Sequence, residues 1–196
     1  MNLSSSKKKE ILWEIKYGSS TATARARCVE RYASLKDPVN NGDGALIHHR
    51  RATQAGSAAV NWEPTMRNVQ YYASNGNANV YLYSFDYRRQ QDHPWWKAVG
   101  SFANLEIMYT ISWPWYNAEQ DEDDKMRRIW SELMTSFAKT GKPTLPAEIT
   151  GEAWLPVNTE TNQNYLSITP YPTMKAGFYE EDVKFWSDLE QLVGSD

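Results

Sequence analysis

The sequence predicts an α/β protein, and three stretches carry the prediction. Residues 64–73 have the apolar spacing of a helix that begins at a proline, and the Asn-Gly-Asn run at 75–77 ends it. Residues 80–87 are β-branched, aromatic and almost continuously apolar, as is typical of a strand covered on both faces. Residues 126–137 give a strongly amphipathic helix. Helix, tight turn and buried strand in this order indicate α/β architecture.

The region before residue 63 has weaker patterns. Residues 7–17 and 24–35 are each consistent with a short helix. A turn cluster with proline and two glycines covers 38–44, and residues 45–59 contain many small side chains without a clear period. We therefore expect a poorly defined helical and loop region at 1–62, followed by a better-defined domain at 63–193.

The remaining elements follow in chain order. Aromatic loops at 93–96 and 112–116 flank the segment 100–111. The next helix has an acidic start at Asp121–Asp124, where negative charge is favourable, and an expected buried face of Met126, Ile129, Trp130, Leu133, Met134 and Phe137. Short extended pieces are expected at 154–156 and 165–168. A last helix is expected at 180–193, with Val183, Trp186 and Leu189 facing inward.

Composition excludes several classes of function. The net charge of −3 argues against a nucleic-acid partner, and the basic run His48–Arg51 is local enough to be solvated surface. One cysteine, Cys28, allows no internal disulfide and no cysteine-based metal site. No apolar run follows the basic residues near the N-terminus, and none approaches the about 20 residues of a membrane span. We expect no signal peptide, membrane segment, metal or cofactor in this chain, and the localisation stays open.

The segment 100–111 resembles the histidine segment of the carboxylesterase type B (cholinesterase-like) family, which reads Gly-Ala-x-His-Gly-x-Glu/Asp-Ile/Leu-x-Tyr-x-Phe. Gly100, Glu106, Ile107 and Tyr109 match this pattern, and Ala103 stands at the catalytic histidine. Family members are often secreted or membrane-attached.

Further motifs follow in the family's order. Residues 134–143 are similar to Trp-x-x-Phe-Ala-x-Thr-Gly-x-Pro, and Trp154, residues 165–168 and the pair at 185–186 come after them. The resemblance covers about residues 60–190, with weaker similarity back to about residue 8, and implies a partial α/β-hydrolase fold, namely its C-terminal strands and covering helices. A family disulfide would join positions near Glu63 and Val183, and both of its cysteines are absent here.

The resemblance also specifies the chemistry to look for. A serine hydrolase needs a Gly-x-Ser-x-Gly nucleophile turn, an oxyanion hole and a histidine oriented by a carboxylate. The chain has no Gly-x-Ser-x-Gly and no Gly-Gly-Gly run, and in the family both lie N-terminal to the aligned part. Alanine at 103 cannot accept a proton. His93 as a displaced base, Glu106 as an acid catalyst and a cation site at Asp121–Asp124 are weaker alternatives to structural roles.

The sequence therefore favours a protein without catalytic, cofactor-binding or metal-binding residues of its own. Our first hypothesis is a non-catalytic carboxylesterase type B-like protein or fragment. One alternative is the C-terminal fragment of a longer carboxylic ester hydrolase. Another is a cholinesterase-like adhesion protein that binds a protein partner through surface helices. An active esterase with displaced catalytic residues conflicts with the absence of every triad element.

Overall fold

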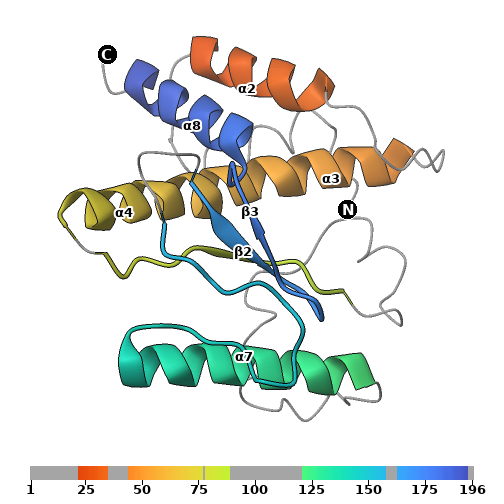
Figure 1. Cartoon of the computed structure of the whole chain (residues 1–196). Coiled ribbons are helices and arrows are strands. Elements are labelled where there is room, and N and C mark those ends of the chain that lie inside the picture. Colours follow the sequence, from red (N-terminus) through yellow and green to blue (C-terminus); the bar gives the residue numbers. More distant parts are fainter. Residues whose placement is uncertain (1–21, 35–43, 77, 89–120, 158–162, 194–196) are drawn as a thin grey trace. The chain divides into compact units, whose positions relative to one another are not determined.

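The computed structural model describes residues 22–34, 44–76, 78–88, 121–157 and 163–193 (Figure 1). Contacts divide the chain into two compact units. The first unit is Met1–Asn68, Pro94–Gly100 and Tyr179–Asp196, and the second is Val69–His93 and Ser101–Phe178. The elements predicted at 7–17, 93–96, 100–111 and 112–116 lie outside the described residues.

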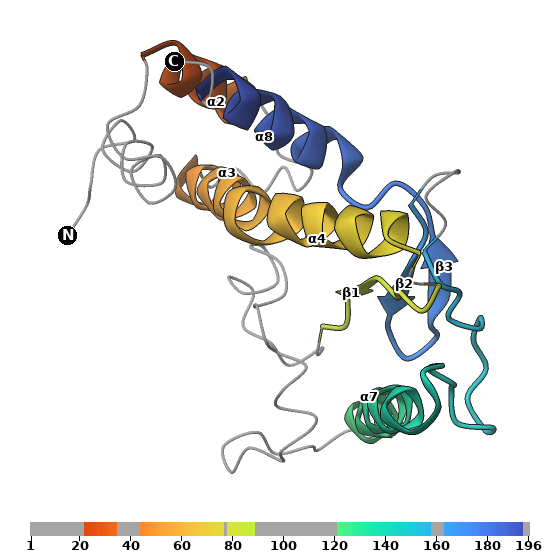
Figure 2. The same ribbon diagram turned by 90° about the vertical axis from the view of Figure 1, so that its left-hand side faces the viewer.

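Helices make up the described part of the first unit. They are α2 (Ala22–Ser34), α3 (Gly44–Ser57), the π-helical turn η1 (Ala58–Trp62), the start of α4 (Glu63–Ser74) and α8 (Glu180–Val193). Ser57 and Glu63, which flank η1, both keep right-handed helical dihedrals, so α3, η1 and α4 follow one another without a break. Figures 1 and 2 show α2 and α8 on the same side of the continuous helix that α3, η1 and α4 form. Helix α2 contacts α3, and α8 contacts η1.

The predicted helices at 24–35 and 180–193 are confirmed, whereas α3 was missed. Its buried face consists of alanines: Ala55, Ala58 and Ala59 are at most 4% exposed and cluster with Trp186 and Leu189 of α8. Small side chains let two helices approach closely, but alanine contrasts too little with its neighbours to give a visible hydrophobic period. Met66, Val69 and Tyr72 carry the apolar spacing that predicts α4. Met66 and Val69 are buried, whereas Tyr72 is 54% exposed.

A three-stranded sheet forms the centre of the described second unit. Its strands are β1 (Tyr83–Phe85), β2 (Tyr165–Ile168) and β3 (Thr173–Lys175), in the order β1-β2-β3. The pair β1–β2 is parallel and the pair β2–β3 is antiparallel. The strand predicted at 80–87 is therefore present with a shorter ladder, the piece at 165–168 is confirmed, and residues 154–156 are not a strand. β3 was not predicted.

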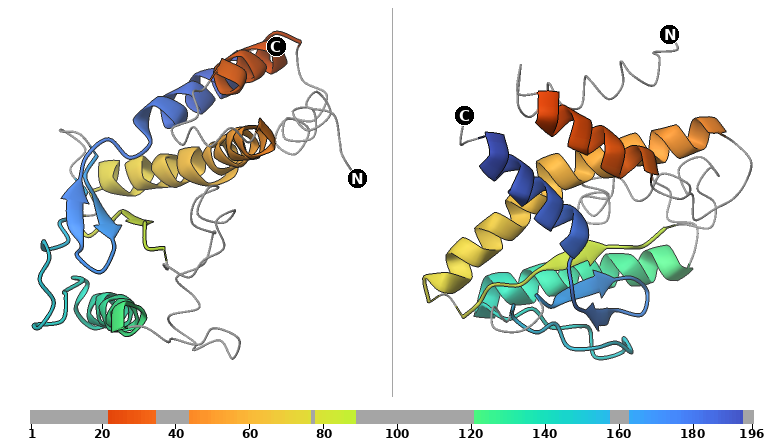
Figure 3. Two further views of the ribbon diagram at one scale, coloured as in Figure 1. Left: turned by 90° about the vertical axis from the view of Figure 1, so that its right-hand side faces the viewer. Right: turned by 90° about the horizontal axis from the view of Figure 1, so that it is seen from above.

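Helix α7 (Asp121–Thr140) covers this sheet in the second unit (Figure 3). Met126, Ile129, Trp130 and Leu133 are buried against the strands, as their spacing predicts. Phe137 was wrongly expected in the core. It is 41% exposed, because it lies in the last turn of the helix, where its ring packs edge-on against that of Tyr81.

Trp154 completes the core of the second unit from a non-strand segment. Its indole N–H donates to the carbonyl oxygen of Leu82 at 3.0 Å, and its ring meets that of Tyr83 edge-on at 5.8 Å. A buried indole needs such an acceptor. The segment around 154 is thus held beside β1 without joining the sheet as a strand.

Asp182 joins the helices of the first unit. This buried carboxylate, in the first turn of α8, accepts hydrogen bonds from Arg31 Nη2 at 3.0 Å, Tyr32 Oη at 3.0 Å and Gln54 Nε2 at 2.9 Å. The indole of Trp186 donates to the Tyr32 oxygen at 2.7 Å. Burial, together with the negative charge of Asp182, raises the pKa of Tyr32, so the phenol keeps the proton that it donates.

We predict that Asp182→Ala destabilises the chain by on the order of 3–5 kcal/mol, because donors from α2 and α3 lose a buried charged acceptor. The matched control is Asp188→Ala on the same helix, where an exposed pair with Lys184 is worth about 0–1 kcal/mol. Urea unfolding followed by tryptophan fluorescence measures both variants. Equal effects of the two substitutions would contradict the role assigned to Asp182.

Candidate functional site

Polar side chains gather where the parallel strands β1 and β2 end. Ser84 lies in β1, Asp86 directly follows it, Ser167 lies in β2 and Lys175 ends β3. In α/β sheets, ligand and reaction sites form outside the carboxyl ends of the strands. These four residues, which we name the Asp86 cluster, are therefore the candidate site among the described residues.

Strand register brings the Asp86 cluster together. Ser84 and Asp86 are two residues apart in extended chain and so share a face, and Ser84 is the registered neighbour of Ser167 in the parallel pair. The main-chain N–H of Asp86 donates to the carbonyl of Ile168 at 3.0 Å, which continues the pairing past the ladder. Asp86 is thereby fixed against β2.

The carboxylate of Asp86 is the acceptor of the whole cluster. Ser84 Oγ donates to Oδ1 at 2.7 Å, and Ser167 Oγ donates to Oδ2. The ammonium group of Lys175 lies 3.3 Å from Oδ2 and brings a positive charge from the far strand. One carboxylate thus links all three strands of the described sheet.

These contacts set the charge of the cluster. Burial alone raises the pKa of Asp86, but the hydrogen bonds from Ser167 and Ser84 and the charge of Lys175 outweigh it, and the net pKa is lowered. The pKa of Tyr165 is raised by burial and by the negative charge of Asp86. The site therefore holds a carboxylate that stays ionised and a phenol that stays protonated.

The cluster contains serine and carboxylate groups, as a catalytic triad does, but it is poorly suited to remove a proton from a serine hydroxyl. A carboxylate with a lowered pKa is a weak base, and it withdraws a proton from a serine hydroxyl far less readily than the imidazole of a triad does. The cluster contains no imidazole. Both serine hydroxyls donate hydrogen bonds to Asp86. The arrangement therefore holds the strands together and does not generate a nucleophile.

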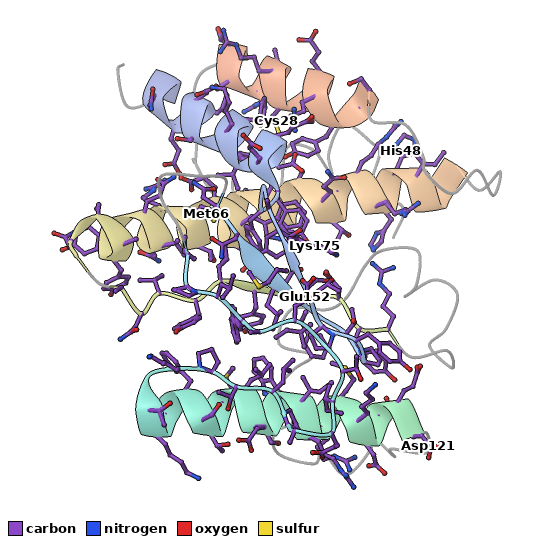
Figure 4. All side chains as sticks on the ribbon, viewed as in Figure 1. Cys28, His48, Met66, Asp121, Glu152 and Lys175 are labelled. Carbon is purple, nitrogen blue, oxygen red and sulfur yellow. The ribbon has the colours of Figure 1, made fainter. Side chains whose placement is uncertain are left out.

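The residues singled out in the sequence fall in several places. Ala103, Glu106 and His93 lie outside the described residues. His48 and His49 are exposed on α3, and Figure 4 shows His48 there. Across the ranges that the structure describes, no group of three or more histidine, cysteine or acidic side chains is placed to hold a metal ion, and no helix is long and apolar enough to span a membrane.

The acidic start of α7 contains a buried member that sequence reasoning missed. Asp121 (Figure 4), Glu122 and Asp124 are exposed, as expected for a helix start. Asp123 is fully buried and accepts a hydrogen bond from Tyr87 Oη at 2.9 Å, which ties the helix to the end of the strand segment. The run therefore has a structural role and shows no cation site.

The position of the missing family disulfide is also informative. Glu63 is buried at the start of α4, and Arg67 donates to its Oε1 from Nη2 at 2.6 Å. Arg67 also pairs with Glu190 of α8. Val183, the other expected disulfide position, is partly buried in α8. An ion-pair network thus joins the two helices that the disulfide would connect, and Cys28 lies partly buried in α2.

A family model described as the carboxylesterase family matches residues 2–186. The chain belongs to the carboxylesterase family. The match includes both the motifs after residue 60 and the stretch back to about residue 8 where the resemblance is weaker. The helices and the small mixed sheet are consistent with part of an α/β fold.

Three curated relatives, named as an esterase, a cholinesterase and a lipase, match the chain. The chain is 23% identical to gut esterase 1 of Caenorhabditis briggsae over 96% of its own length and 34% of the relative. It is 30% identical to acetylcholinesterase of Bungarus fasciatus over 56% of the chain and 18% of the relative. It is 27% identical to bile salt-activated lipase of Rattus norvegicus over 64% of the chain and 21% of the relative. The chain thus spans about a third or less of these relatives.

We predict that the stabilising effect of Asp86 depends on pH. Because its folded pKa is lowered, its contribution is fully present above the unfolded value of about 3.9 and is lost as the pH falls through the folded pKa. Asp86→Asn should therefore cost stability at pH 7 and progressively less below about pH 4. Urea unfolding of both proteins across this range is the measurement. A cost that is the same at every pH would show that the charge of Asp86 is not what holds the strands.

Proposed function

We propose that this chain is a non-catalytic part of a carboxylesterase type B-like protein, and that it supplies strands and covering helices without supplying reactive groups. The observation that carries the proposal is the alanine at position 103 in a sequence without Gly-x-Ser-x-Gly. The Asp86 cluster supports it, because its serines and carboxylate are bonded to one another in a way that stabilises the sheet. The assignment of residues 63–193 to the C-terminal part of such a domain stays a prediction.

A second proposal is that the chain is the C-terminal fragment of a longer carboxylic ester hydrolase. It is favoured by the coverage of the relatives, since an esterase and a lipase each extend far beyond the matched part. The nucleophile and the oxyanion hole would then come from residues outside this chain, and Ala103 would still remove the general base. The coding sequence upstream of the first codon separates the two proposals: intact Gly-Gly-Gly and Gly-x-Ser-x-Gly segments favour the hydrolase origin.

We predict that the chain does not accelerate hydrolysis of a p-nitrophenyl ester above the buffer rate, because the nucleophile turn and the histidine are both missing. Ala103→His should not create activity either, since a base without an activated serine has nothing to deprotonate. Absorbance of released p-nitrophenolate measures both proteins.

His93→Ala is the informative control for this experiment. A rate above the buffer value that disappears in His93→Ala would identify His93 as a displaced base and overturn the non-catalytic proposal. A rate that Ala103→His raises would show that a usable nucleophile exists in this chain.

A further inference from the structure

The turn that ends α4 contains the pair Asn75 and Gly76, which is chemically labile. In such a pair the main-chain nitrogen of the glycine attacks the side-chain carbonyl carbon of the asparagine, because glycine has no Cβ to obstruct the approach. The new N–C bond closes a succinimide ring, and the C–N bond of the side-chain amide breaks, so that ammonia leaves with the proton of the attacking nitrogen. Water then opens the ring at either carbonyl and gives aspartate or isoaspartate.

Both reacting groups are held by hydrogen bonds in the folded turn. The N–H of Gly76 donates to the carbonyl of Ala73 at 3.2 Å, and Asn75 Nδ2 donates to the carbonyl of Tyr71 at 2.6 Å. Ser74 Oγ donates to the same Tyr71 carbonyl at 3.1 Å. The attacking N–H and the side-chain amide are thus both bound to the last turn of the helix. Ring closure requires both bonds to open, as happens when a helix end frays.

The surroundings of the turn leave room for the reaction. Asn75 and Gly76 are exposed to water. A Cβ atom placed at Gly76 would have nothing within 4 Å, so glycine is required there by its φ of 81° and not by crowding. A frayed turn therefore has both the space that the ring needs and the water that opens it.

Helix α7 ends with the same geometry but without the labile residue. Gly141, which follows α7, has a φ of 72°. Thr140 before it donates from Oγ1 to the carbonyl of Ser136, four residues earlier, at 2.8 Å. A threonine thus satisfies a carbonyl at this helix end as Asn75 does at the end of α4, with no amide to lose. The helix end itself does not require asparagine, and Asn75 adds a reactivity that α7 lacks.

We propose that Asn75 is a site of spontaneous deamidation, which the folded end of α4 holds back and which fraying of that end permits. The product has a negative charge at the C-terminus of α4, where the helix dipole disfavours it. It also lacks the amide donor to the carbonyl of Tyr71. Each conversion therefore weakens the turn that had slowed it, and the conversion does not reverse spontaneously.

The test follows Asn75 in the full chain at mildly alkaline pH, in the native state and in denaturing urea. Trypsin cleaves after Arg67 and Arg88, so the peptide 68–88 is separate from the one that contains Asn41, the other asparagine before a glycine. Mass spectrometry measures the conversion of amide to acid, and fragment ions locate it within the peptide. We expect slower conversion of Asn75 in the native chain than in urea.

A matched pair of substitutions tests whether the end of α4 controls the reaction. Ala73→Gly loosens the last turn of α4 and should raise the native rate about 2–5-fold, as expected for a glycine within a helix. Ala138→Gly makes the same change three residues before Gly141 and should leave the rate at Asn75 unchanged. In urea both variants should react as the unsubstituted chain does. Asn75→Thr, which copies the end of α7, should abolish conversion at this position.

Four outcomes would overturn the proposal. Equal rates in the native and the urea-denatured chain would show that the folded turn gives no protection. An equal increase in both glycine variants would assign the reaction to global unfolding, and an unchanged native rate in Ala73→Gly would also contradict control by fraying. Conversion of Asn41 without any conversion of Asn75 in urea would show that the pair at 75–76 is not reactive.

Discussion

A buried carboxylate must be surrounded by donors, and this constraint organises both compact units of the chain. An unpaired charge in a protein interior costs several kcal/mol, so each buried acid determines which elements lie next to it. Buried Asp182 requires α2 and α3 beside α8, and partly buried Asp86 holds β2 and β3 beside β1. Asp123 holds the start of α7 through its hydrogen bond from Tyr87, and Glu63 holds the start of α4 through its bond from Arg67. Four of the chain's 24 acidic side chains are thereby used for structure.

Elements with strong hydrophobic contrast could be predicted from the sequence. The helices α7 and α8 have large apolar residues at helical spacing, and both were found where expected. α3 was not, because its buried face is made of alanine. β3 could not be predicted either, since three residues of mixed character form a strand only when β2 provides the main-chain partners. Both misses are cases in which tertiary contacts, and not the local pattern, determine the structure.

The candidate site was partly visible in the sequence. Ser84 and Asp86 are polar residues at alternate positions of an otherwise apolar stretch, which is a sign of a shared polar face. Ser167 and Lys175 join them only through strand pairing across some eighty intervening residues, and no local pattern indicates that. The buried roles of Asp182 and Asp123 could not be predicted. Both lie in the first turn of a helix, where acidic residues are common, so nothing in the sequence distinguishes them from their exposed neighbours.

The family assignment of this chain and its proposed lack of reactivity rest on different observations. The family match covers residues 2–186, and the proposed lack of reactivity rests on Ala103, which the sequence resemblance places at the general base. The most direct test of this account is the intact mass of the full chain after treatment with a fluorophosphonate, which reacts covalently with activated serines. We predict an unchanged mass, with Ser84 and Ser167 unmodified. A stoichiometric adduct mapped to either serine, or to any other serine of the chain, would contradict it.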